Sequence, residues 1–114
     1  MFDFEKLHIY QKAKLFNSEI RTFIKSSNLD STTKDQLRIA SFSIVLNITE
    51  GSGRFTKPDR RNFYIISRSS IFECIAILDV LKDEEALEKN RYEEFYVQAE
   101  EISKMLYEVI KNLG

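Results

Sequence analysis

The sequence predicts an all-α fold, a single domain in which four antiparallel helices form an up-down-up-down bundle. First, apolar residues recur at three- and four-residue spacing along four long stretches, the period of an amphipathic helix. Second, the chain has only three glycines and one proline, too few for the turns of a fold with many short strands. Third, a 43% apolar content over 114 residues suffices for one hydrophobic core and one domain covering residues 1–114.

The first helix is predicted over residues 3–27. Its end is indicated by Ser26, Ser27 and Asn28, short polar side chains that compete with the helix for backbone hydrogen bonds. Its apolar positions follow the helical period and predict one buried face: Phe4, Leu7, Ile20, Phe23 and Ile24.

The second helix is predicted over residues 32–50, and Gly51 and Gly53 are expected to stop it. This helix is apolar on two sides. One stripe is expected to face the core of the chain and contains Leu37, Ala40, Ile44 and Ile48. The other stripe predicts an interface with a second copy of the chain, because so small a domain cannot bury both sides: Ile39, Phe42, Val45 and Leu46.

The third helix is predicted over residues 58–82, beginning at Pro58, a residue suited to the first helical position. The fourth is predicted over residues 90–112. The short connections between the helices favour antiparallel neighbours.

Several classes of function are excluded by what the chain lacks. Cys74 is the only cysteine and His8 the only histidine, so one chain forms neither a disulfide nor a two-histidine metal site. No stretch is apolar enough to span a membrane, and the first residues do not resemble a leader peptide. We therefore expect a cytoplasmic protein with no enzymatic activity, no cofactor and no bound metal.

Charge is distributed unevenly along the chain. Residues 1–68 hold 12 Lys and Arg against 7 Asp and Glu, whereas residues 69–114 hold 5 against 11. Such asymmetry indicates either one basic and one acidic surface, or charges that complement each other across the bundle or between subunits.

Basic residues cluster at the start of the third helix, with Phe55 and Tyr64 between them. Clustered cations bind phosphates and aromatic rings stack on bases, so this pattern indicates a nucleic-acid surface. The alternative is a solvated helix face, or ion pairs with the acidic segment 83–94 of a neighbouring copy. The candidate nucleic-acid-binding residues are Arg38, Arg54, Lys57, Arg60, Arg61 and Arg68.

A polar motif closes the second helix and contains Asn47, Glu50, Gly51 and Gly53. The favoured interpretation is structural, with Asn47 and Glu50 hydrogen-bonding the turn to the third helix. A glycine-rich turn can also hold an anion, but this one follows a helix and lacks the lysine of a phosphate-binding loop.

Three segments resemble the 23S rRNA intervening-sequence family of four-helix bundle proteins. The opening Phe4–Ala13 is similar to the family start F-x-x-L-x-V-W-x-x-A. Gln36–Arg54 is similar to Q-x-x-R-A-A-x-S-I-x-x-N-I-A-E-G-x-G-R, and the third helix follows with Phe63, Ile66, Ser70 and Glu73. A related branch is the accessory variability determinant of diversity-generating retroelements.

The resemblance implies a bacterial-type four-helix bundle that assembles as a ring, typically a pentamer, without catalytic residues. We therefore expect a non-enzymatic homo-oligomeric scaffold that contacts RNA or an RNA-associated protein through the basic residues. The alternative is a protein–protein interaction module that binds no nucleic acid.

Overall fold

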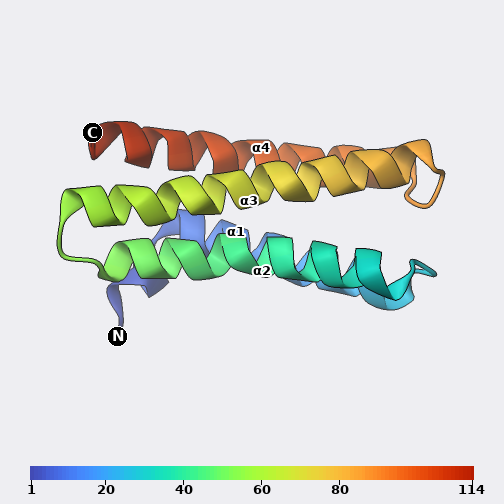
Figure 1. Cartoon of the computed structure of the whole chain (residues 1–114), viewed down its shortest axis with the longest axis horizontal. Helices are drawn as coiled ribbons and strands as arrows, with labels where there is room; N and C mark the ends of the chain where they lie inside the picture. The colour runs from blue at the N-terminus through green and yellow to red at the C-terminus, as the bar shows by residue number, and fades with distance from the viewer.

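The computed structural model describes all 114 residues and contains four α-helices and no strand, which confirms the predicted all-α class. The helices lie side by side and give the molecule extents of 44 × 24 × 21 Å (Figure 1). A short 3-10 helix, η1 (Asp3–Lys6), precedes them. The four α-helices are α1 (His8–Ser26), α2 (Ser31–Gly53), α3 (Lys57–Asp83) and α4 (Lys89–Asn112).

The connections between the helices lie at alternating ends of the bundle (Figure 1). The α1–α2 and α3–α4 connections lie at one end of the bundle. We call it the α3–α4 end, and it contains residues 84–88. The α2–α3 connection and both chain termini lie at the other end. We call it the α2–α3 end, and it contains residues 54–56.

The first helix does not begin at residue 3 as predicted. Residues Asp3–Lys6 form the 3-10 helix, Leu7 is extended with φ −77° and ψ 128°, and α1 begins at His8. The break brings the rings of Phe4 and Tyr10 to a centroid distance of 4.8 Å. In an unbroken α-helix, two residues six positions apart point in different directions, so the kink is what allows this aromatic contact.

The predicted stop at Gly51 is wrong, because α2 continues through this residue and ends at Gly53. Neither glycine has a positive φ, so neither serves as a left-handed cap. Gly51 is buried against the ring of Tyr64, and a Cβ at this position would lie 2.9 Å from Tyr64 Cε1. Gly51 is therefore a close-approach residue that lets α3 pack on α2.

Side-chain caps begin two of the helices. Asp30 caps α2, since its Oδ1 accepts from the Thr33 amide and its Oδ2 from the Thr33 hydroxyl, each at 2.8 Å. These bonds to the charged form lower the pKa of Asp30. Thr56 caps α3, with its Oγ1 accepting from the Asp59 amide at 3.3 Å.

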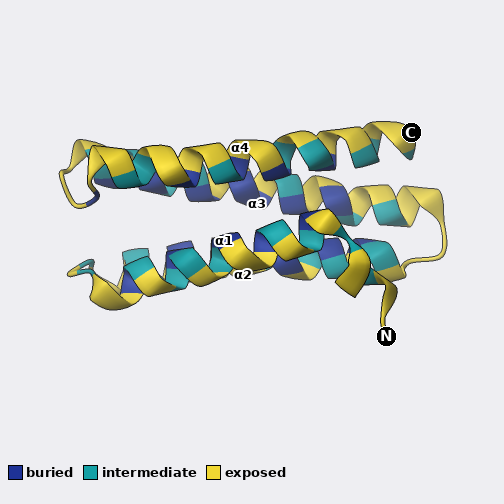
Figure 2. Cartoon of the chain, turned by 180° about the vertical axis from the view of Figure 1, so that it is seen from behind, coloured by how far each residue is buried: buried dark blue, intermediate teal, exposed yellow.

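The core lies between the four helices, where the buried sides of the ribbons face one another (Figure 2). Phe95 of α4 is fully buried and meets Phe16 and Phe23 of α1 edge-on, each at 6.0 Å between ring centroids. The predicted core stripe of α2 is buried as expected: Leu37, Ala40, Ile44 and Ile48.

The second apolar stripe of α2 divides between solvent and core. Ile39, Phe42 and Leu46 are exposed, but only 7% of Val45 is accessible. The assignment of Val45 to a surface stripe is therefore wrong, because its side chain belongs to the hydrophobic core. The exposed stripe consists of Ile39, Phe42 and Leu46.

Serine side chains join the helices around α2. The hydroxyl of Ser67 on α3 donates to the carbonyl of Ile44 on α2 at 2.8 Å, and Ser70 and Ser43 share a hydrogen bond of 2.9 Å. Small side chains at these positions allow α2 and α3 to approach closely, and each buried hydroxyl has a partner.

Candidate nucleic-acid interface

The structure divides the predicted basic residues among three places. Arg54, Lys57, Arg60 and Arg61 lie at the α2–α3 end. Arg38 lies sixteen residues before Arg54, about 24 Å away along α2, and is paired with Asp35 at 2.6 Å. Because of that separation and that partner, Arg38 does not belong to the basic cluster.

Three cations and one aromatic ring lie at the α2–α3 end, where Glu50 and Asp59 are also exposed, and we call the cations and the ring the tip surface. Phe55 stands fully exposed in the connection between the helices. Lys57 and Arg61 are exposed, lie one turn apart on α3 and form no salt bridge. The tip surface consists of Arg54, Phe55, Lys57 and Arg61.

Arg54 is the most constrained residue of the tip surface. Its guanidinium pairs with Glu50 at 3.0 Å and lies over the ring of Phe63, with Cζ 4.5 Å from the ring centroid. This ion pair is exposed, so it contributes little to stability but fixes the direction of the cation. Glu50 therefore partners Arg54 at the end of α2.

Arg60 has a structural role rather than a surface one. It is half-buried, and its guanidinium donates to the carbonyls of Gly51 at 3.4 Å and Ser52 at 3.5 Å. These carbonyls belong to the last turn of α2, where the helix dipole favours a positive charge. Arg60 thus caps α2 from α3.

Two further predictions about this region need correction. Tyr64 is buried under Gly51, and burial raises the pKa of its phenol, so its ring is not available for stacking on a base. Asn47 does not bond the turn between α2 and α3. Its amide donates to the carbonyl of Ser43 at 2.9 Å and to the Ser43 hydroxyl at 3.0 Å, one turn earlier in α2.

The acidic segment 83–94 lies at the α3–α4 end, opposite the tip surface (Figure 1). The long axis of 44 Å separates the two, so they do not form ion pairs within one chain. The acidic segment and the tip surface therefore lie at opposite ends of the bundle.

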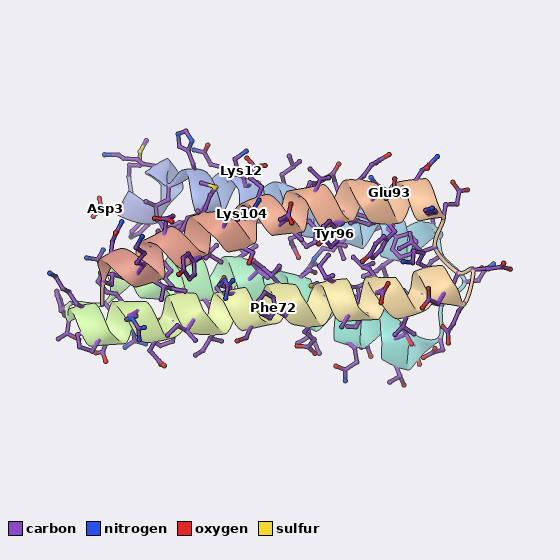
Figure 3. The ribbon with its side chains drawn as sticks, turned by 90° about the horizontal axis from the view of Figure 1, so that it is seen from above. Asp3, Lys12, Phe72, Glu93, Tyr96 and Lys104 are labelled. Atoms are coloured by element: carbon purple, nitrogen blue, oxygen red, sulfur yellow. The ribbon has the colours of Figure 1, made fainter.

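A groove between α3 and α4 has a volume of about 520 Å³ and was not predicted (Figure 3). Arg68 lies in this groove rather than with the tip surface, and its Nε donates to the carbonyl of Ser103 at 3.4 Å. The spacing of Tyr96, Ser103 and Tyr107 on one side of α4 is the sequence signal that indicates it.

The single cysteine and the acidic side chains are further groups that could react or bind a metal. Cys74 is fully buried, and burial raises the pKa of its thiol to about 12, with Glu73 adding a smaller effect in the same direction. The thiol therefore stays protonated at neutral pH. No three His, Cys, Asp or Glu side chains are grouped so that they could hold a metal ion. None of the helices combines the length and the apolar character that crossing a membrane requires.

Both the sequence and the fold of this chain are similar to those of known proteins. The sequence matches the family described as 23S rRNA-intervening sequence protein over residues 5–108. The chain belongs to this family. The family segment Gln36–Arg54, identified above by resemblance, forms most of α2 and reaches the tip surface.

A solved structure has the same fold as this member of the 23S rRNA-intervening sequence protein family. It is a protein of unknown function from the S23 ribosomal protein family of Bacteroides thetaiotaomicron, with a TM-score of 0.85 and 24% sequence identity. The match covers 90% of this chain and 98% of that chain. No curated protein matches the sequence.

Proposed function

We propose that this chain is a non-enzymatic oligomeric scaffold that contacts RNA, or a complex of RNA and protein, through the tip surface. The observation that carries the proposal is the fully exposed ring of Phe55 beside Lys57 and Arg61, two cations without acidic partners. Phosphates attract such cations, and an unpaired base gains stacking energy on an exposed ring.

The proposal includes an assembly of several copies. The alternating connections support an up-down-up-down bundle, and family membership supports a ring, with a pentamer as the expected size. An assembly would bring several tip surfaces together, and multiple weak contacts on one RNA would then add in avidity.

The double variant Lys57→Glu/Arg61→Glu is expected to bind RNA about 10- to 100-fold more weakly than the wild type, because two phosphate contacts become repulsive. The slope of log affinity against log salt concentration should flatten by about two units. Fluorescence anisotropy of a labelled structured RNA, titrated at about 50 and 200 mM salt, measures both quantities.

The control carries the same charge change at the opposite end of the bundle. Lys25→Glu/Lys89→Glu alters two exposed lysines near the α3–α4 end and should leave most of the affinity intact. Arg60 is left unchanged, because its reversal would also disturb the end of α2. Equal RNA affinity in the tip variant and the wild type would refute the tip surface as the RNA site.

The exposed stripe of α2 is the proposed contact between copies. Ile39 is 65% accessible, and Arg21 of α1 lies over Phe42 with its Cζ 4.9 Å from the ring centroid. A row of exposed apolar side chains along one helix is unfavourable in water unless a partner covers it.

Ile39→Glu/Leu46→Glu is expected to shift the protein from the assembly to the monomer, because charged side chains replace the apolar contact. Sedimentation velocity at a fixed protein concentration measures the mass. The matched control is Leu15→Glu/Val97→Glu, which changes two equally exposed apolar residues on α1 and α4. Unchanged mass in the α2 variant would exclude this stripe as the interface.

The second candidate function is a protein–protein interaction module without nucleic acid. It is favoured by the position of the acidic segment 83–94 opposite the tip surface, since head-to-tail contact of two copies would pair the two charges. This function requires an assembly that loosens as salt is raised. An assembly mass that is the same at low and high salt would exclude it.

A further inference from the structure

The groove between α3 and α4 carries cations at one end and aromatic rings along its length. It extends along α3 from Arg68 to Asp79, about 16 Å at the helical rise. Its floor contains the buried side chains of Ile71 and Ala99. Figure 3 looks onto the groove, with Phe72 on α3 and with Tyr96 and Lys104 on α4.

Arg68 is held in place without any acidic partner. Its Cζ lies 4.9 Å from the ring centroid of Phe72 and 5.5 Å from that of Tyr107, and its Nε donates to the Ser103 carbonyl. It forms no salt bridge, although Glu100 lines the same groove and Glu108 an adjoining hollow. An arginine held between rings, with its charge unpaired, is oriented to bind an anion.

Lys104 extends the cationic end of the groove. Its side chain is mostly exposed, and its only acidic contact is Glu100 at 3.7 Å, too long for a strong bond. One turn along α3 from Arg68, the ring of Phe72 is 55% accessible, and Tyr96 across the groove is 43% accessible. Arg68 and the exposed ring of Phe72 thus lie about one helical turn apart, whereas Tyr96 and Lys104 lie about two turns apart on α4.

We propose that the α3–α4 groove binds a single-stranded segment of RNA, with a phosphate at Arg68 and Lys104 and an unpaired base against Phe72 and Tyr96. The proposal rests on the RNA-binding function proposed above and adds a second contact, which selects unpaired strands. The bases of a duplex cannot stack on these rings, because they are already stacked and paired with one another. The groove volume lies within the range of about 300–1,000 Å³ common for sites of small ligands.

The unpaired guanidinium of Arg68 disfavours an apolar helix as the occupant of the groove. Such a helix would cover Arg68 and leave its guanidinium buried without an acidic partner, which is strongly unfavourable. A nucleotide supplies both the anion for Arg68 and the flat ring for Phe72 and Tyr96.

The test uses the full-length protein and a short oligouridylate in which one base is iodouridine, a photoreactive probe for stacked aromatic side chains. Irradiation and peptide mass spectrometry should place a cross-link at Phe72 or Tyr96. Phe72→Ala should lower the affinity for the single strand about tenfold, and Arg68→Gln by a similar factor. Both residues are at least partly exposed, so folding should be retained, and circular dichroism checks this.

The outcomes separate the groove from the tip surface. A cross-link in the groove that Arg68→Gln abolishes supports the proposal, and Phe55→Ala serves as the matched control that removes only the exposed ring of the tip. A cross-link confined to Phe55 overturns the groove and leaves the proposed function standing. Absence of binding to any RNA overturns both. Loss of the assembly in Phe72→Ala would make the groove a contact between copies and overturn its role in RNA binding.

Discussion

Phe95→Ala is expected to lower the free energy of unfolding by about 3–5 kcal/mol, the cost of deleting a fully buried aromatic side chain. Phe95 is inaccessible to solvent and contacts both Phe16 and Phe23 edge-on, so its ring joins α4 to α1. Neither ring can move far into the space that alanine leaves, because both belong to the same rigid helix.

Urea denaturation followed by circular dichroism measures the change, at one protein concentration, since assembly would add a concentration-dependent term. Val97→Ala, two residues along α4, is the control, because Val97 is 64% accessible. It should change the stability by no more than about 0.5 kcal/mol. A loss below about 1 kcal/mol in Phe95→Ala would mean that the packing of α1 against α4 adds little to the stability of the fold.

Gly51→Val is expected to lower the free energy of unfolding by about 3 kcal/mol, near the upper end for overpacking of a core. A Cβ alone would lie 2.9 Å from Tyr64 Cε1 and 3.1 Å from Cδ1 and Cζ. The ring of Tyr64 is itself buried, so it has nowhere to move. The two methyl groups of valine would force α2 and α3 apart at the base of the tip surface.

Gly53→Val is the matched control, the same substitution two residues later in the same helix. A Cβ at Gly53 meets nothing within 4 Å, and its φ is not positive. Its stability should therefore stay within about 0.5 kcal/mol of the wild type. Thermal unfolding of both variants measures the difference. Equal unfolding temperatures for the two would contradict the close contact between Gly51 and Tyr64.

Helical periodicity predicts much of this fold, because the spacing of apolar residues along the sequence indicates which side of each helix is buried. The core stripe of α2, from Leu37 to Ile48, was found in this way. The role of Gly51 was not, because it depends on Tyr64, a contact made by a different helix. The kink at Leu7 was missed for the same reason, since the contact of Phe4 with Tyr10 requires it.

The candidate site was predicted in part. Composition finds the cations but not their partners, so Arg38 and Arg60 were grouped with residues of a different role. Of the two aromatic residues in the cluster, Phe55 is exposed and Tyr64 is buried. The α3–α4 groove needs residues from two helices, and no single stretch of sequence contains it.

The acidic segment 83–94 and the cations of the tip surface lie at opposite ends of the longest dimension of the chain, so these two groups of charges respond in opposite directions to an external field. In the field of a polyanion, such a rod experiences a torque before it makes any contact. If the chain binds RNA as proposed, this torque would turn it so that the tip arrives first and the acidic connection trails. This orientation shortens the search for a productive encounter at low ionic strength, and it is lost once salt screens charges beyond about 10 Å.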